Sequence, residues 1–377
     1  MLTSIVLASA LAWQPAVTVA TGPGEKGEWR QNDSHYRYVD DPSVALADSG
    51  DALVAWADQA RKDVYLQRFG VKGEPRGKPV NLSRNPETFS WLPRVATSGL
   101  RVYALWQEII FTGGSHGGDI LFARSEDGGA SFSEPLNLSA RSLAGDGKGR
   151  ITREHWDNGS LDLAVAADGT LYTAWTEYEG TLWLARSADG GRTFQPRQRI
   201  AGDDAQPARA PALAVGGTTL HIAWTTGDIH VRSGEKTRTF KRRAGYADAP
   251  KLAVDGRGAL HLVYAEDGVV YHSAGMAPAR PISPKGAAFP SLAVSEDKVH
   301  VLWEAGQGLA WTVSADGGES FSTPASVPGT GDAPNGGNQG RLMRKLAVDR
   351  AGTVAVAHSS FVPGKSSRVL LVRATPK

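Results

Sequence analysis

The sequence predicts an all-β fold assembled from seven repeated units. Three observations lead to this prediction. The 377 residues include 44 Gly and 21 Pro, and one apolar pattern recurs seven times along the chain. Within each unit, apolar and polar residues alternate with the period of a β-strand. So many turn-forming residues are typical of short strands joined by tight turns, and 11 Trp, 9 Tyr and 10 Phe supply core material that a disordered chain lacks.

The first element is an N-terminal apolar segment. Residues 1–20 carry no charge, hold an apolar stretch over residues 5–13, and end in small residues at Ala20. This pattern predicts a secretory signal peptide cleaved near Ala20, and Pro15 leaves the stretch too short to span a bilayer. We therefore expect a single folded domain over residues 21–377 in a secreted or periplasmic protein.

The repeated unit consists of a small residue or Pro, a Leu-Ala-Val-like run, a Gly or Asp turn, and an apolar run that ends in an aromatic residue. Two alternating stretches around a tight turn predict a β-hairpin, and a third strand follows, for example at residues 181–186. The seven copies cover residues 42–56, 93–106, 161–175, 211–224, 250–264, 290–303 and 344–358.

A sharper motif, S-x-D-G-G-x-[S/T]-F, follows the third strand in three units. It occupies residues 125–132, 187–194 and 314–321, with its acidic residue at Asp127, Asp189 and Asp316. The Asp can accept hydrogen bonds from nearby backbone N–H groups, the glycines permit positive φ, and the Phe fills an apolar gap. We expect these three Asp residues to be structural.

The motif resembles the Asp-box, or BNR, repeat of the sialidase superfamily, in which it joins the third and fourth strands of a β-propeller blade. The resemblance implies a β-propeller of four-stranded blades over the whole mature chain. Seven units predict seven blades, with the six blades of familiar sialidases as the alternative. The last unit ends without a fourth strand, so we expect an N-terminal strand near residues 35–39 to close the ring, because an open edge invites aggregation.

Charge and composition exclude several partners. Lys and Arg total 41 against 39 Asp and Glu, without long runs of one sign, and there is no Cys. Nucleic-acid binding, disulfides, thiolate catalysis and Cys-ligated zinc are therefore not expected. We also expect no metal, no cofactor, no membrane span, and a monomer.

Loop lengths indicate which face of the ring is functional. The turns between the first and second strands are short, whereas the three longest excursions, residues 109–119, 140–160 and 330–341, all fall on the opposite face. Long loops on one end of a rigid scaffold usually carry binding and catalysis.

Acidic residues follow the second strand on that face, at Asp58, Glu108, Glu177, Glu266 and Glu304. One interpretation is that each acid merely ends a strand in solvent. The other is that some converge on the channel mouth as acid, base or sugar-hydroxyl acceptors. Glu177 beside Tyr178 is the strongest catalytic candidate, and Glu108 is a substrate-binding candidate.

Three arginines at first-strand starts, Arg94, Arg209 and Arg344, are candidates for a carboxylate cradle, since a guanidinium presents a planar fork of donors. Sialidases use an arginine triad for this purpose, and Arg209-Ala210-Pro211 is similar to the R-I-P motif of that family. Here, however, the motif opens the fourth unit instead of the first. Ordinary surface arginines are the alternative interpretation.

Two histidines in the longest loops, His116 and His155, complete the candidates, together with Trp156 and Asp157 next to His155. No tight ligand spacing supports a metal pair. Solvated loop residues are the alternative interpretation.

Three functions remain open. The resemblance implies a secreted glycan-active hydrolase, with Glu177 activating Tyr178 as nucleophile and Asp157 as general acid. A polysaccharide lyase would instead use His116, His155 or Tyr178 beside a uronate whose charge Arg209 neutralises. The third is a non-catalytic propeller that binds a glycan or a protein, because one fold hosts many functions.

Overall fold

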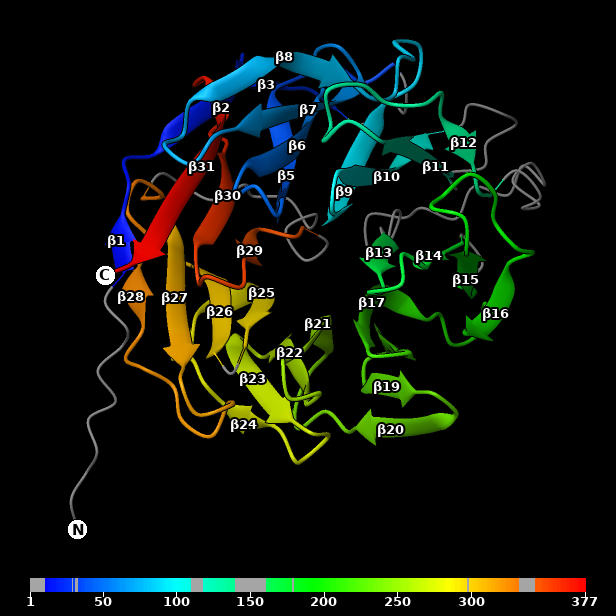
Figure 1. Cartoon of the computed structure of the whole chain (residues 1–377), viewed down its shortest axis with the longest axis vertical. Helices are drawn as coiled ribbons and strands as arrows, with labels where there is room; N and C mark the ends of the chain where they lie inside the picture. Colours follow the sequence, from blue (N-terminus) through cyan, green and yellow to red (C-terminus); the bar gives the residue numbers. More distant parts are fainter. Residues whose placement is uncertain are drawn as a thin grey trace.

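The computed structural model describes residues 11–28, 30, 33–109, 118–139, 161–177, 180–296, 298–331 and 343–377. All regular structure in these ranges is β-strand, and seven antiparallel sheets stand around a common axis as the blades of a β-propeller (Figure 1). In the part of the chain so described, no helix is long and apolar enough to span a membrane. The all-β prediction and the seven blades are confirmed.

Each of the first six blades is a four-stranded sheet in sequence order, with its first strand nearest the axis (Figure 1). Blades 1 to 3 comprise β5 (Val39–Leu46), β6 (Ala52–Asp58), β7 (Asp63–Phe69) and β8 (Pro75–Asn81); β9 (Ser90–Ser98), β10 (Arg101–Ile109), β11 (Gly118–Ser125) and β12 (Leu136–Asn137); and β13 (Leu161–Val165), β14 (Leu171–Thr176), β15 (Leu182–Ser187) and β16 (Gln198–Ala201). Blades 4 to 6 comprise β17 (Arg209–Gly216), β18 (Thr219–Thr225), β19 (Ile229–Ser233) and β20 (Lys236–Phe240); β21 (Ala247–Val254), β22 (Leu260–Glu266), β23 (Val269–Ala274) and β24 (Arg280–Pro281); and β25 (Ala287–Ser295), β26 (Lys298–Ala305), β27 (Leu309–Ser314) and β28 (Ala325–Ser326).

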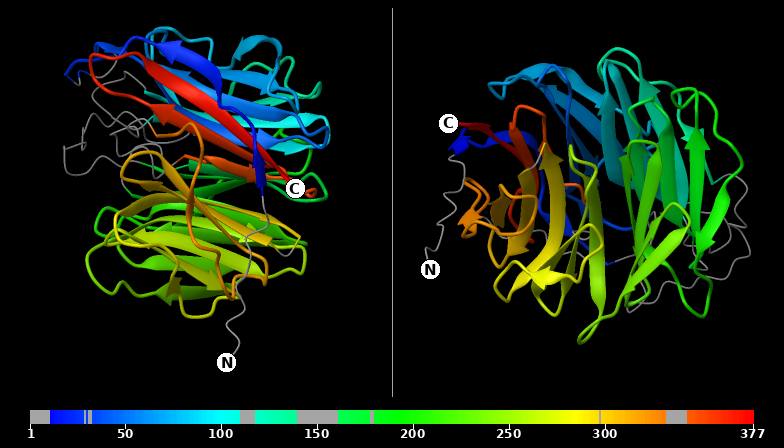
Figure 2. Two further views of the ribbon diagram at one scale, coloured as in Figure 1. Left: turned by 90° about the vertical axis from the view of Figure 1, so that its left-hand side faces the viewer. Right: turned by 60° about the horizontal axis from the view of Figure 1, so that its bottom comes forward.

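Blade 7 combines the two ends of the chain. Its C-terminal strands are β29 (Leu346–Val348), β30 (Val354–Ser360) and β31 (Ser367–Pro376), and its outer edge is formed by β2 (Val17–Gly22) and β1 (Leu11–Trp13), both antiparallel to β31. Figure 2 shows the blue N-terminal strands alongside the red β31. An N-terminal strand therefore closes the ring, as predicted.

The predicted identity of that strand is wrong. Residues 36–37 form β4 (Tyr36–Arg37), which pairs only with the short β3 (Glu25–Lys26) among the described residues, and Val39 already begins the first strand of blade 1. The apolar residues of the predicted signal peptide fill the outer position instead: Val17 and Val19 pack on the core between blades 7 and 1, and Trp13 lies edge-on to Trp311 at 6.1 Å. Residues 11–20 thus belong to blade 7, and the fold begins before the predicted boundary at residue 20.

Second-strand aromatics make the core between blades. Trp106, Trp175 and Trp303 are almost fully buried, because this position of the repeat faces the neighbouring sheet. His358 takes the equivalent place in blade 7, where burial lowers its pKa to about 3, so that the imidazole is neutral and serves as packing.

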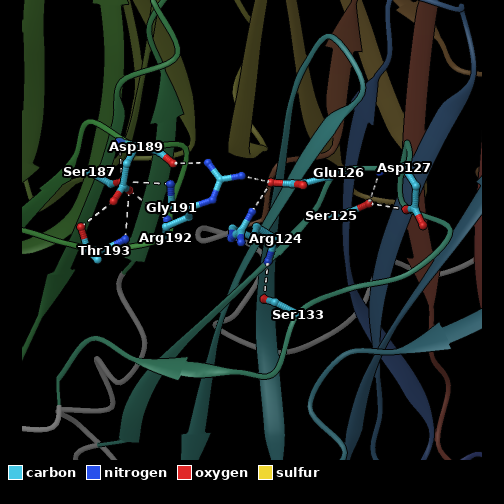
Figure 3. A network of polar contacts seen from close by, with 10 residues as sticks. All are labelled: Arg124, Ser125, Glu126, Asp127, Ser133, Ser187, Asp189, Gly191, Arg192 and Thr193. Atoms are coloured by element: carbon cyan, nitrogen blue, oxygen red, sulfur yellow. Dashed lines mark hydrogen bonds and ion pairs between the residues drawn. The ribbon is translucent and has the colours of Figure 1, made fainter.

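The S-x-D-G-G-x-[S/T]-F segments, residues 125–132, 187–194 and 314–321, are called DGG turns below. In the first, Asp127 accepts bonds from the backbone N–H groups of Ala130 and Ser131, both at 2.9 Å, and from the Ser131 hydroxyl at 2.6 Å. Gly128 and Gly129 have φ of 69° and 86°, a region that favours glycine. Arg192 of the second turn reaches Glu126 of the first at 2.6 Å (Figure 3). The DGG turns thus connect third and fourth strands and join neighbouring blades.

Antiparallel pairing puts the DGG turns and the turns between first and second strands at one end of the ring, called the turn face. The connections between second and third strands, and those from one blade to the next, lie at the other end, called the loop face. The three long excursions start and finish at strand ends on the loop face.

Candidate functional site

The structure describes five of the ten predicted catalytic and substrate-binding residues. His116, His155, Trp156, Asp157 and Tyr178 lie outside the described residues. The five that can be placed are Arg94, Glu108, Glu177, Arg209 and Arg344.

A β-bulge repeated in the first strands positions the residues that face the axis. In five blades a residue with φ between 50° and 56° stands immediately before a proline: Asp41, Leu92, Ala210, Ala249 and Phe289. Proline has no N–H to contribute to the ladder, so it is tolerated at a bulge, while positive φ before proline stores strain. The residue after the proline is thereby presented at an equivalent level of each blade.

That level surrounds a cavity on the propeller axis with a volume of about 320 Å³. Arg94, Ala212, Lys251 and Ser291, each directly after a bulge proline, line it. The walls continue along the first strands to Leu46, Thr97, Val165 and Val348 at their turn-face ends.

Four charged residues, Arg94, Asp162, Lys251 and Arg344, form an axial ionic cluster in the cavity wall. Arg344 donates to Asp162 Oδ1 at 2.6 Å and to the Leu163 carbonyl at 2.9 Å, and Arg94 Nε lies 3.9 Å from the same Oδ1. The other carboxylate oxygen of Asp162 accepts the N–H of Leu213 at 2.8 Å. Asp162 is the second residue of β13 and Arg344 precedes β29, so the cluster lies toward the loop-face end of the first strands.

Burial lowers the pKa of two basic groups in the cluster, Arg94 and Lys251. Burial, together with repulsion from Arg344, lowers the pKa of Arg94 to about 10, despite the attraction of Asp162. It lowers the pKa of Lys251 to about 7, with Arg94 and Arg344 acting in the same direction against Asp162 and Asp248. Among the described residues that line the cavity, three are basic and one, Asp162, is a carboxylate.

A buried carboxyl group adjoins this cluster. Burial and then the neighbouring Asp40 raise the pKa of Asp41 well above its usual range, although the Leu92 N–H donates to it at 3.3 Å and Arg94 lies nearby. Its Oδ1 has no hydrogen-bond partner among the described residues. Both effects disfavour the charged form of Asp41, so it offsets the charge of Arg94 less than an ordinary carboxylate would.

Of the three predicted arginines, Arg94 and Arg344 meet at Asp162, but Arg209 does not line the cavity. Arg209 instead hydrogen-bonds the Tyr246 side chain in the connection to blade 5. The cavity thus joins two of the three predicted arginines and adds Lys251.

The acids after the second strands are engaged in local contacts. Glu108 accepts from Asn85 at 3.2 Å, and from Ser90 and the Trp106 indole at 3.4 Å each. Burial raises its pKa, against these bonds. Glu108 therefore fastens the connection between blades 1 and 2.

Glu177 has a similar setting in blade 3. It accepts from the Trp175 indole at 3.4 Å and pairs with Arg197, whose guanidinium lies 4.2 Å from the Trp183 ring centre. Its side chain is only 8% exposed. Glu177 is thus not an acid that ends a strand in solvent, and it does not line the axial cavity; its contacts order the end of the blade.

Lys251 and Asp162 were missed by the sequence reasoning. Both occupy the repeat position that also holds Arg94, so aligning the seven units at that position would have revealed a ring of residues around one axis. In the described ranges, no group of three or more His, Asp or Glu residues is arranged to hold a metal ion.

Comparisons with known proteins establish the fold. No protein-family model matches the chain, and no curated protein matches it by sequence. Among solved structures, the polysaccharide lyase Uly1 is similar with a TM-score of 0.61 and 10% identity, over 97% of this chain and 99% of that one. The Penicillium chrysogenum α-L-arabinanase bound to arabinobiose gives 0.52 and 11%, over 97% and 98%, and YCF48 bound to D1 peptide gives 0.50 and 13%, over 97% and 96%. At these identities the similarity concerns the propeller fold alone.

Proposed function

We propose that this protein binds an acidic glycan and holds the carboxylate of one sugar unit in the axial cavity. The observation that carries the proposal is the convergence of Arg94 and Arg344 on one point of the cavity wall, 3.9 Å and 2.6 Å from Asp162 Oδ1. Guanidinium groups offer paired donors to a carboxylate, and such bonds are stronger where water is excluded. A cavity of about 320 Å³ is at the small end of ligand sites and suits a single sugar unit.

The excess of basic groups favours an acidic over a neutral glycan. Asp162 occupies one side of the two guanidinium groups, but it is a single carboxylate among three basic residues. A uronate carboxylate would supply the missing negative charge. The predicted secretory leader, itself a hypothesis, would bring the protein to extracellular glycans.

The second candidate function is β-elimination on a uronate polymer. In that reaction Arg94 and Arg344 would neutralise the carboxylate and so acidify the adjacent carbon-bound proton. The separation of Arg209 from the other two arginines favours this reaction over a sialidase-type arginine triad. His116, His155 and Tyr178 remain the predicted proton-transfer residues.

The test is a screen of the purified protein against polygalacturonate, alginate, hyaluronate and fluorogenic sialosides. We expect binding to at least one uronate polymer, and ultraviolet absorbance of unsaturated products if the protein is a lyase. Binding without products would indicate a non-catalytic glycan receptor. Release of the fluorophore from sialosides would instead support the hydrolase.

Arg344→Gln is the diagnostic variant, because Arg344 is partly exposed while Arg94 is buried. We expect it to weaken uronate binding at least tenfold. Arg192→Gln, on the turn face, is the matched control and should bind as the parent does. Equal binding by both variants, with unchanged melting temperature, would refute the assignment of the axial cavity.

A further inference from the structure

The outer edge of blade 4 concentrates positive charge. β20 is the last strand of its sheet, and Figure 1 shows it at the rim of the ring. Residues 228–243 hold six basic residues against two acidic ones, so this short segment has a net charge of +4, whereas the whole chain has +2. Five of the six are called the basic edge below: Arg232, Lys236, Arg238, Lys241 and Arg242.

Most of the basic edge has no acidic partner. Lys236, Arg238 and Arg242 are exposed, and Arg232 is half-buried. In the part of the chain that the structure describes, the side chains of these four form no ion pair. Lys241 pairs with Asp228 at 2.8 Å, yet its side chain is 79% exposed. The basic edge therefore faces solvent with uncompensated charge.

The sixth basic residue of the segment, Arg243, is engaged within the fold. It lies 3.4 Å from Glu266 and 4.2 Å from the centre of the Tyr271 ring. Its contacts join blade 4 to blade 5, so we do not count it as part of the basic edge.

Protection of a sheet edge does not explain this charge. Charged side chains on an edge strand prevent it from pairing with another chain, but this role does not require a single sign. β8, the outer strand of blade 1, shows the difference: its Arg76 lies 3.1 Å from Asp51 and 3.5 Å from Glu74. The basic edge lacks such neutralisation, which favours a negatively charged partner.

The loop-face end of the basic edge leads toward the axial cavity. Arg242 Nη1 and Tyr246 Cε2 lie 3.0 and 3.4 Å from the position that a Cβ on Gly227 would take, so both side chains border the same spot. Tyr246 is 41% exposed and its side chain hydrogen-bonds Arg209. Arg209 begins β17, whose Ala212 lines the cavity. A chain-like ligand that leaves the cavity over β17 would thus reach Tyr246 and then the basic edge.

The side chains around the basic edge suit a polysaccharide better than a nucleic acid. Single-stranded nucleic acids are usually held by several exposed aromatic side chains on which successive bases stack. Phe240 is buried, and among the described residues Tyr246 is the exposed aromatic next to the edge. Repeated cations with one aromatic neighbour match the regularly spaced carboxylates of an acidic glycan.

We propose that the basic edge of blade 4 binds the carboxylates of successive units of an acidic polysaccharide, outside the axial cavity. This inference builds on the proposed function and adds a second surface to it, so that a polymer binds more tightly than its single sugar. The five residues of β20 extend over about 17 Å at the usual rise of a strand, which is long enough to meet several charged units at once.

Calorimetry with D-galacturonate and with hexagalacturonate tests the inference. Lys236→Gln combined with Arg238→Gln should weaken binding of the hexamer about tenfold in about 50 mM salt, because two exposed charge contacts are lost. The difference should shrink in about 500 mM salt, which screens exposed charges. Binding of D-galacturonate should not change.

A matched control is available in blade 1. Arg76→Gln combined with Lys78→Gln removes two positive charges from the outer strand β8 and should bind the hexamer as the parent does. Equal weakening by the two double variants would show that only the net charge of the protein matters. Unchanged binding of the hexamer by the blade 4 variant would show that the basic edge does not contact it, and either result would overturn the inference.

Two further measurements separate the alternatives. A thymidine hexanucleotide should bind at least tenfold more weakly than hexagalacturonate, and equal affinity would overturn the assignment to a polysaccharide. Arg344→Gln tests the axial cavity on its own: if it leaves sugar and hexamer binding unchanged while the blade 4 variant weakens the hexamer, the proposed function fails and the basic edge stands. The opposite pattern refutes the basic edge and leaves the proposed function intact.

Discussion

Removal of residues 1–20, as cleavage near Ala20 would produce, should open blade 7. The deletion removes β1 and most of β2, leaving only Thr21 and Gly22 of the N-terminal edge paired with β31. Residues 1–10 precede both strands, so deletion of these ten residues alone is the matched control.

The loss can be estimated from the side chains that the deletion takes away. Leu11, Trp13, Val17 and Val19 are partly buried and pack on the core. Half-burial of each contributes roughly 1 kcal/mol. The backbone bonds of the lost pairs, about 1 kcal/mol each, are offset by the conformational entropy that the freed residues regain. The free energy of unfolding should therefore fall by about 4 kcal/mol.

Thermal unfolding measures this difference. With an unfolding entropy of about 2.1 cal/mol/K per residue, 4 kcal/mol corresponds to about 5 °C for a domain of this size. The longer deletion should also aggregate, because β31 becomes an exposed edge strand. Melting temperatures within 1 °C of each other for the two deletions would refute the closure by β1 and β2.

We further expect intact-mass analysis of exported protein to place its N-terminus at or before Leu11; Ala8-Ser9-Ala10 is a small-residue sequence of the kind at which leaders are cut.

Four further predictions concern single residues. Burial tends to raise the pKa of Asp127, but hydrogen bonds from Ser131, Ser125 and Ala130 outweigh it and lower the pKa to about 2. Asp127→Ala should therefore lower the free energy of unfolding by roughly 1 kcal/mol at pH 7, a figure reduced because the carboxylate is exposed. Unfolding measured at decreasing pH should show this difference vanish between pH 4 and pH 2. Asp162→Asn should lower the free energy of unfolding by about 3 kcal/mol, because it leaves Arg94 and Arg344 without their buried anion. The same variant should bind glucuronate more tightly than the parent. Weaker binding in calorimetry would contradict the assignment of the cavity as a carboxylate site. Glu177→Gln should change any turnover rate by no more than about threefold, because the carboxylate pairs with Arg197. Loss of a general acid or base would lower the rate by a factor of about 10² to 10⁴. A decrease of that size would show that Glu177 is catalytic. Gly318→Ala would place a Cβ 2.3 Å from the His272 ring at φ of 88°, and it should destabilise blades 5 and 6 by about 3 kcal/mol. Gly234→Ala, at a position with open space around it, should lower the free energy of unfolding by only about 1 kcal/mol. Urea titration of both variants measures the difference.

The local chemistry of the repeat could be read from the chain alone. The period of the seven units, the hairpin within each and the DGG turns depend on neighbours in sequence, so alternation, turn residues and spacing predicted them. The second-strand tryptophans follow from the same logic, because one position of every unit must face the next blade.

Contacts between segments that are far apart in the sequence cannot be predicted from such local patterns. The sequence predicts the strand that completes blade 7 at residues 35–39, because the apolar residues before Ala20 match the pattern of a leader. An apolar strand and a leader have the same residue pattern, so the pairing of β1 and β2 with β31 cannot be predicted from that pattern.

The axial ionic cluster likewise depends on contacts between distant segments, so local patterns do not predict it. The sequence predicts Arg94 and Arg344 as separate candidates. Their convergence on Asp162, the exclusion of Arg209 and the presence of Lys251 arise where seven blades meet at one axis. The sequence by itself determined a ring of seven turn-rich β units with a plain face and a variable one. Only the tertiary structure decided which charges share the axial cavity, because residues about 50 to 250 positions apart become neighbours when the ring closes, and burial there changes their protonation.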